Sequence, residues 1–134
     1  MQQATHLAMQ GDLCGQPVVL SAGRAVVELL TRPEMRADEQ NLVHGGFVFG
    51  LADYAAMLAI NEPNVVLGSA EVRLLAPVVV GDSLCATARL ARVEGKKHFV
   101  EVEVLRGADS VFFGTFVCFV PPTHVLTAHT GDHA

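Results

Sequence analysis

One aspartate lies within a long apolar stretch that begins with a histidine and two glycines. The stretch reads His44-Gly45-Gly46-Phe47-Val48-Phe49-Gly50-Leu51-Ala52-Asp53, and Asp53 is the only charged residue between His44 and Asn61. Burying an unpaired carboxylate is costly, so we expect Asp53 to have a polar partner or to line a cavity. Glycines let the backbone approach a ligand closely, and the free amides at a helix start attract negative charge. An acid together with such donors is what acyl-transfer chemistry requires.

The residues after His44 predict a long buried helix. From Gly45 to about Asn61 they are small or apolar without alternation, and their number suits a helix of about four turns. A helix that is apolar around most of its circumference must be wrapped by other structure. Asn61 and Pro63 are expected to end it.

Strand-like segments lie on both sides of this helix. Val18–Leu20 and Arg24–Leu30 precede it, and a polar loop from Thr31 to Leu42 follows them. After the helix we expect strands at Val65–Leu75, Val78–Arg92 (with a turn at Gly81-Asp82), Lys97–Leu105 and Ser110–Val120. Short turns make these strands antiparallel. The predicted fold class is therefore α+β, one antiparallel sheet wrapped round one long central helix.

Length and composition limit the classes of protein that this chain can belong to. Its 134 residues fit a single domain, with an ordered core expected at about 18–122 and a disordered C-terminal tail at 123–134. A content of 51% hydrophobic and 17% charged residues excludes a disordered chain and indicates a buried subunit interface. The net charge of −5 argues against nucleic acid as a partner.

The cysteines and the N-terminus indicate a cytoplasmic protein without a metal site. Cys14, Cys85 and Cys118 are widely spaced and include no C-x-x-C pair, so neither zinc nor a disulfide framework is expected. Residues 1–10 lack the pattern of a signal peptide, and no apolar segment is long enough to span a membrane.

The pattern Asn41-x-x-His44-Gly45-Gly46-x6-Asp53 resembles that of the hotdog-fold acyl-CoA thioesterases, specifically the phenylacetyl-CoA and 4-hydroxybenzoyl-CoA thioesterase group. Two downstream segments, Glu71–Leu84 with its Pro77 and Gly81-Asp82 turns and Gly114–Val117, resemble strands of the same family. The resemblance covers roughly residues 18–122. It implies a thioesterase that hydrolyses an acyl-CoA or a related thioester to acid and thiol, with coenzyme A as part of the substrate and with no other cofactor. It also implies a homodimer joined edge to edge, commonly paired into a homotetramer, with active sites between protomers.

The resemblance also implies roles for five residues. Asp53 matches the catalytic carboxylate, which acts as general base or as nucleophile, and the alternative is a structural acid. Gly45 and Gly46 match an oxyanion hole, although a tight entry into the helix also explains them. His44 is interpreted as a positioning residue beside the thioester or as a helix cap. Asn41 is a candidate for orienting the water or the carbonyl.

The sequence departs from many members of that family at two positions. Asp38 stands where they carry Gln or Asn six residues before the histidine, and a second acid facing Asp53 would raise a pKa. Met57 stands where several carry a Ser or Thr that helps bind the water or the acid. Ser69 is a candidate to take over that function.

Further candidates for substrate binding lie outside the motif. Basic residues gather at a predicted hairpin round Glu94-Gly95, where they are candidates to bind coenzyme A phosphates or are ordinary solvated turn residues; they are Arg92, Lys96, Lys97 and His98. Arg73 is another candidate. Phe49 and Tyr54 are candidates to line an acyl pocket, although core packing also explains them.

Two other functions are alternatives to hydrolysis. The first is a non-catalytic hotdog protein that binds acyl-CoA or a small apolar ligand in the same cleft, which the missing hydroxyl at Met57 favours. The second is a hotdog hydratase or dehydratase, which places a histidine after the acid on the helix. Met57, Leu58 and Ala59 occupy those positions here, so hydratase chemistry is disfavoured.

Overall fold

The small and apolar residues after His44 form a long helix, α2 (Gly45–Ile60), in the computed structural model, which describes residues 1–127. Nine of its residues are buried, and they are distributed around the helix rather than along one stripe. The helix ends at Asn61, which adopts a left-handed conformation with φ 54° and donates its backbone amide to the carbonyl of Met57. The prediction of an enclosed helix is therefore confirmed.

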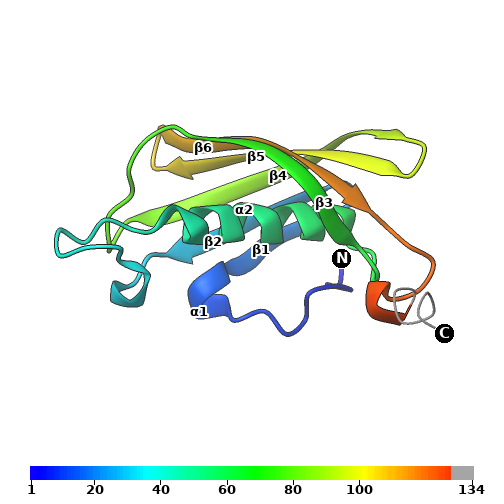
Figure 1. Cartoon of the computed structure of the whole chain (residues 1–134), viewed down its shortest axis with the longest axis horizontal. Coiled ribbons are helices and arrows are strands. Elements are labelled where there is room, and N and C mark those ends of the chain that lie inside the picture. The colour runs from blue at the N-terminus through cyan, green and yellow to red at the C-terminus, as the bar shows by residue number, and fades with distance from the viewer. Residues whose placement is uncertain (128–134) are drawn as a thin grey trace.

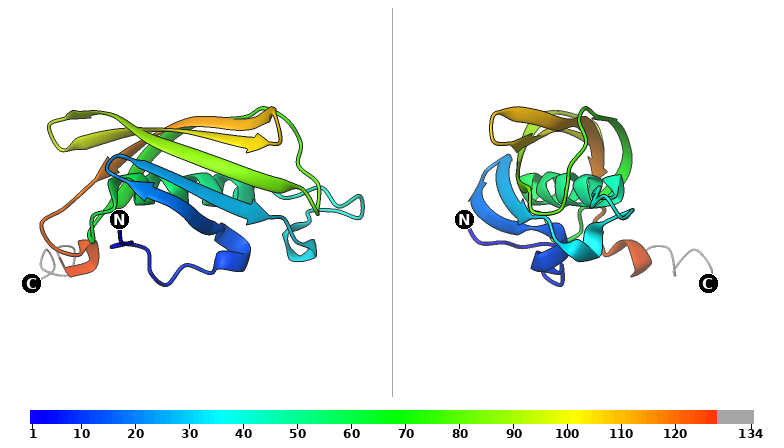
Figure 2. Two further views of the ribbon diagram at one scale, coloured as in Figure 1. Left: turned by 180° about the vertical axis from the view of Figure 1, so that it is seen from behind. Right: turned by 90° about the vertical axis from the view of Figure 1, so that its left-hand side faces the viewer.

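A six-stranded antiparallel sheet curves round this helix (Figure 1). Seen end-on in Figure 2, the helix lies inside the curve of the sheet. The strand order is β1-β2-β4-β5-β6-β3, so β1 and β3 form the two edges. The strands are β1 (Gln16–Ser21), β2 (Arg24–Leu30), β3 (Val66–Leu74), β4 (Ser83–Glu94), β5 (Lys97–Arg106) and β6 (Asp109–Phe119).

Tight hairpins set the register of the central strands. Glu94 pairs with Lys97 at the turn from β4 to β5, and Arg106 pairs with Asp109 at the turn from β5 to β6. Gly95 and Gly107 adopt positive φ angles of 59° and 60° in these turns, a conformation that glycine adopts without steric cost. The sheet with its central helix confirms the predicted fold class, and most strand ends lie within two residues of the predicted ones.

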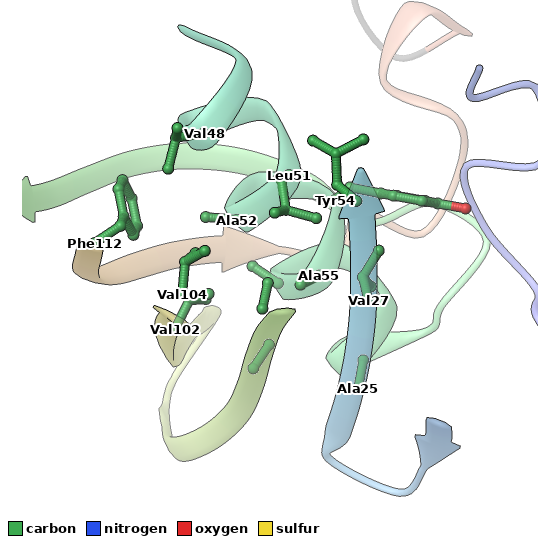
Figure 3. Close-up of a cluster of buried hydrophobic side chains, with 14 of the residues drawn as sticks. Ala25, Val27, Val48, Leu51, Ala52, Tyr54, Ala55, Val102, Val104 and Phe112 are labelled. Atoms are coloured by element: carbon green, nitrogen blue, oxygen red, sulfur yellow. The ribbon is translucent and has the colours of Figure 1, made fainter. Parts of the chain in front are cut away.

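The core lies between α2 and the concave face of the sheet (Figure 3). Leu51, Ala52 and Ala55 of the helix are buried among Val102 and Val104 of β5 and Phe112 of β6. Every second residue of β5 and β6 therefore faces the helix, as a period of two requires. Because these helix residues pack on the sheet, other residues of α2, such as Asp53 and Met57, face a cavity.

Irregular segments precede β1, connect β2 to α2 and follow β6. Before β1, residues 1–10 run as an extended segment into a one-turn helix, α1 (Gly11–Cys14). A 3-10 turn, η1 (Pro33–Met35), lies within the loop expected between β2 and α2. At the C-terminal end, Val125–Thr127 form a helical turn within the segment for which disorder was expected. Residues 128–134 of that expected tail lie outside the described part of the chain.

Candidate functional site

Asp53 lies near the middle of α2 and is its only charged side chain. The carboxylate is partly buried, and its Oδ1 atom is buried without a hydrogen-bond partner among the described residues. Burial raises the pKa of Asp53 to about 6 because the charged form loses its hydration. A carboxylate with such a pKa is ionised at neutral pH yet more basic than an ordinary aspartate, which suits a general base.

A cavity of about 390 Å³ contains this carboxylate. Its walls come from both ends of the chain, from α2 and from the start of β3, and they are formed by Thr5, His6, Asp53, Met57, Pro63, Asn64, Val65, Val66, Leu67, His124 and Val125. The apolar residues of this set can hold an acyl or alkyl group beside the acid.

The N-terminal segment supplies two residues of this cavity that sequence reasoning missed. Thr5 is 4% exposed, and its Oγ1 lies 2.8 Å from Nδ1 of His6. Burial lowers the pKa of His6, which favours its neutral form. No periodicity or motif in residues 1–10 indicates that this segment returns to the helix, so the sequence offered no signal for it.

The diglycine lies at the start of α2, away from the Asp53 cavity. Gly45 lines a separate cavity of about 270 Å³ with residues that include Leu74 and Pro77. Gly46 lies against the ring of His44. A Cβ atom at position 46 would come within 3.0 Å of that ring, so a larger residue would be crowded there. Amides in the first turn of a helix have no intrahelical partner and can bind an anion. Within one chain, however, these amides and the Asp53 carboxylate are not brought together.

Residues of the preceding loop form a third concavity. Asn41 lines it together with Arg36, Ala37, Asp38 and Glu39, and it adopts a left-handed conformation with φ 65°. The Asp38 carboxylate accepts hydrogen bonds from the backbone amides of Gln40 and Leu42, so this acid stabilises its own loop. Asp38 and Asp53 line different cavities that share no residue, so Asp38 does not face Asp53 within one chain.

The remaining candidates for substrate binding divide into core and surface residues. The Phe49 ring packs on Phe112 and Phe116, and Tyr54 is 5% exposed with its hydroxyl 3.0 Å from Nε2 of Gln3. Ser69 and Arg73 lie exposed on the edge strand β3. None of these four lines the Asp53 cavity within one chain.

The basic hairpin adjoins the Asp53 cavity. Arg92 pairs with Glu94 and stacks 3.9 Å from the ring centroid of Phe99, so its charge is already engaged. Lys96 lines a largely apolar cavity of about 540 Å³ that shares Val66 and Val125 with the Asp53 cavity. These two valines therefore separate the cavity beside the hairpin from the cavity that contains the acid.

Residues 1–127 offer neither a metal site nor a spanning helix. No group of three or more His, Cys, Asp or Glu side chains in this part of the chain is arranged to hold a metal ion. All three cysteines are free, and burial together with the nearby Asp53 raises the pKa of the Cys118 thiol to about 12. None of the helices described is long and apolar enough to cross a membrane.

The sequence model of the thioesterase superfamily matches residues 40–112, which include α2 with Asp53, the strands β3, β4 and β5, and the start of β6. The chain belongs to the thioesterase superfamily. Similar proteins of known structure include an uncharacterised protein of Pyrococcus horikoshii, which is 54% identical with a TM-score of 0.92 and is matched over 94% of this chain and 97% of that one. A mutant of the phenylacetic acid degradation protein PaaI of Thermus thermophilus is 28% identical with a TM-score of 0.74, over 81% of this chain and 95% of that one.

Two longer relatives contain a segment similar to this thioesterase-superfamily chain. A methylthioribose-1-phosphate isomerase of Aquifex aeolicus is 50% identical over 116 residues, which are 87% of this chain and 25% of that protein. The transcription factor FapR of Caldanaerobacter subterraneus is 29% identical over 107 residues, which are 79% of this chain and 54% of that protein. The chain thus spans about a quarter to a half of these curated relatives.

Proposed function

We propose that this protein is a thioesterase that hydrolyses an acyl-CoA or a related acyl thioester, with Asp53 as its catalytic acid–base group. The observation that carries the proposal is the partly buried carboxylate, with a pKa of about 6, in a cavity that combines apolar walls with a few polar groups. Membership of the thioesterase superfamily supports the same chemistry. The apolar walls suit an acyl group, and a carboxylate beside them suits a general base that activates water.

The proposed reaction uses Asp53 twice. The carboxylate removes a proton from water while the water oxygen attacks the thioester carbon, and the carbonyl electrons move onto oxygen. When the oxyanion collapses, the C–S bond breaks and the thiolate takes the proton from the Asp53 carboxyl group. The products are the free acid and the thiol, and Asp53 is ionised again for the next cycle.

The oxyanion donors in this proposal come from a second copy of the chain. Gly45 and Asp53 line separate cavities of one protomer, so the Gly45 and Gly46 amides can act on the thioester only if another protomer presents them. The exposed edge strand β3 offers a surface for pairing with a second copy. We therefore propose a homodimer, paired further into a homotetramer, as the active form.

An alternative role for Asp53 is nucleophilic attack on the thioester carbon, which would give an acyl–enzyme anhydride. The nucleophilic role alone forms a covalent intermediate. A single turnover in ¹⁸O-labelled water, followed by mass spectrometry of the peptide that contains Asp53, detects it when water opens the anhydride at the aspartyl carbon, because the label then enters the aspartate side chain. Because water can also attack the acyl carbon, the intact protein is weighed in a rapid quench as well: an added acyl group indicates a nucleophile, and neither an added acyl group nor label in the side chain indicates a general base.

A panel of acyl-CoAs tests the function itself. Thiol release is measured for short-chain, medium-chain, phenylacetyl and 4-hydroxybenzoyl thioesters with wild type, Asp53→Asn and Asp109→Asn. Loss of the acid–base group is expected to lower kcat by about 10²–10⁴-fold. Asp109 is an exposed acid in a hairpin turn, so its variant is expected to match wild type. Equal rates for wild type and Asp53→Asn would exclude the proposed role of Asp53.

Binding without hydrolysis is a second candidate function. A transcription factor, FapR, shares 29% identity over 107 residues with this chain, which shows that a related segment occurs in a protein named as a regulator. Met57 also offers no hydroxyl beside Asp53. Calorimetry with an acyl-CoA separates the two functions, because saturable binding of a thioester that stays intact for hours supports a binding protein.

A further inference from the structure

We propose that His6 is a second catalytic residue of the Asp53 site, where its imidazole binds and orients the water that Asp53 deprotonates. This inference rests on the proposed thioester hydrolysis and assigns a role to an N-terminal residue outside the motif region. His6 and Asp53 line the same cavity although they are 47 positions apart in the sequence.

The other side chains of the cavity are less suited to this function than His6. Met57 lies one turn beyond Asp53 on the same side of α2, and its thioether is only a weak acceptor. Asn64 donates its side-chain amide to the carbonyl of Pro121, and exposed His124 accepts the Leu126 amide at Nδ1. His6 is the more buried of the two histidines, and its ring lies next to the buried Thr5.

The His6 ring is held in one orientation. Nδ1 lies 2.8 Å from the Thr5 hydroxyl, which leaves Nε2 for a ligand of the cavity. The ring centroid lies 6.5 Å from that of Tyr54. The His6 backbone adopts φ 54°, an uncommon left-handed conformation that persists only where surrounding contacts enforce it.

The neutral ring can accept a hydrogen bond from the water. When Nδ1–H donates to the Thr5 hydroxyl, Nε2 accepts one proton of the water while Asp53 accepts the other. Within residues 1–127, the other titratable side chains that line this cavity are Asp53 and His124, and the Tyr54 ring lies beside that of His6. Two acceptors then hold the water oxygen with a lone pair free to attack the carbonyl carbon.

Asn61 positions the segment that carries His6. Its Oδ1 accepts the Ala4 amide at 2.8 Å, and its Nδ2 donates to the Gln2 carbonyl at 2.9 Å. The Gln3 side chain adds a contact of 3.0 Å to the Tyr54 hydroxyl, which extends from the core toward this segment (Figure 3). We call residues 2–6 the N-terminal strap. Asn61 acts only through this strap and is therefore a positioning residue.

The test compares His6→Ala, His6→Gln and Leu7→Ala in steady-state hydrolysis of an acyl-CoA that wild type cleaves. His6→Ala is expected to lower kcat by about 10–100-fold with KM within about threefold, because the water loses one of its two acceptors. Imidazole added to the buffer is expected to restore part of the kcat of His6→Ala, and His6→Gln, which keeps an acceptor, is expected to lose less. Leu7 is 73% exposed beside the strap, so Leu7→Ala is expected to match wild type.

Other results would overturn the role of His6. If His6→Ala keeps the kcat of wild type, His6 has no catalytic role, and the thioesterase proposal is unaffected. If the kcat of His6→Ala falls and neither added imidazole nor the His6→Gln substitution restores it, the ring only supports the strap and the proposed role is wrong. If the wild-type protein hydrolyses no thioester, the proposed function is wrong, and so is the catalytic role of His6.

Discussion

Gly45 and Asp53 line two different cavities of one chain and are separated by about 12 Å along the axis of α2. An oxyanion donor must lie about 3 Å from the oxygen that it stabilises. A thioester attacked by the Asp53 water is therefore beyond the reach of the same chain's Gly45 amide. The helix that carries both groups keeps them apart, so the proposed active site needs a second copy of the chain to supply the amides.

This separation predicts complementation between two inactive variants. Asp53→Asn removes the base, and Gly45→Pro removes the amide hydrogen at the first helical position, where proline is tolerated because His44 is extended. In an equal mixture that exchanges subunits freely, each mixed dimer contains one intact site. The mixture is thus expected to regain about a quarter of wild-type activity, as measured by thiol release after subunit exchange.

Gly45→Ala is the matched control for this experiment. It keeps the amide hydrogen and introduces the same Cβ atom, which would come within 2.8 Å of the flexible end of Leu74. Loss of one oxyanion donor typically lowers kcat by about 10²–10³-fold, so the proline variant is expected to fall well below the alanine variant. Equal activity of these two variants, or no recovery on mixing, would argue against Gly45 as a donor.

The pKa of Asp53 predicts how hydrolysis depends on pH. The reaction needs the ionised carboxylate, so kcat/KM is expected to rise with pH through a midpoint near 6 and to level off above pH 7. The profile is recorded between pH 4.5 and 8 with a thioester that is stable over that range. A rate that stays constant from pH 7 down to pH 5 would contradict an essential carboxylate with this pKa.

The same pKa predicts a change in the free energy of unfolding. Between about pH 4 and pH 6 the folded Asp53 binds a proton that the unfolded chain has released, so wild type loses stability as pH rises through this window. Asp53→Asn has no carboxyl group at this position and does not lose stability in this way. The unfolding free energy of Asp53→Asn minus that of wild type is therefore expected to increase by about 2–3 kcal/mol from pH 4 to pH 7. Urea unfolding at both pH values measures the change, and an Asp109→Asn control is expected to show little of it.

Lys96 and Lys97 provide a test of coenzyme A recognition at the hairpin. Neither lysine pairs with a carboxylate within residues 1–127, whereas Arg92 is paired with Glu94. If these lysines bind phosphate groups, Lys96→Glu/Lys97→Glu should raise KM for an acyl-CoA by about tenfold. It should leave KM unchanged for the matching N-acetylcysteamine thioester, which has no phosphate. If KM changes equally for both substrates, Lys96 and Lys97 do not bind the phosphates of coenzyme A.

The sequence predicted the parts of the fold that follow from local pattern. The small and apolar residues from Gly45 onward allow only an enclosed helix, and the alternation in Lys97–Leu105 allows only a strand with one buried face. The strand ends were less well predicted, because pairing across a hairpin extends β4 to Glu94, beyond the apolar pattern that ends at Arg92. Such an extension depends on the partner strand and not on the residues themselves.

The sequence predicted only part of the candidate site. It predicted Asp53, because a lone acid in an apolar helix is expected to line a cavity, and the cavity around it agrees with that expectation. It did not predict His6, because the position of this residue depends on the contacts of Asn61 with a segment that has no periodicity. Phe49 and Tyr54 packed into the core, since aromatic side chains on an enclosed helix have few other places to lie.

The Asp53 cavity is bounded by chain segments close to both ends of the described residues, at Thr5-His6 and at His124-Val125. Neither segment belongs to the sheet or to α2, so each holds its place in the wall through its own contacts, such as those of Asn61 with the backbone of Gln2 and Ala4. A change that displaces either segment therefore alters the surroundings of the acid without disturbing the sheet.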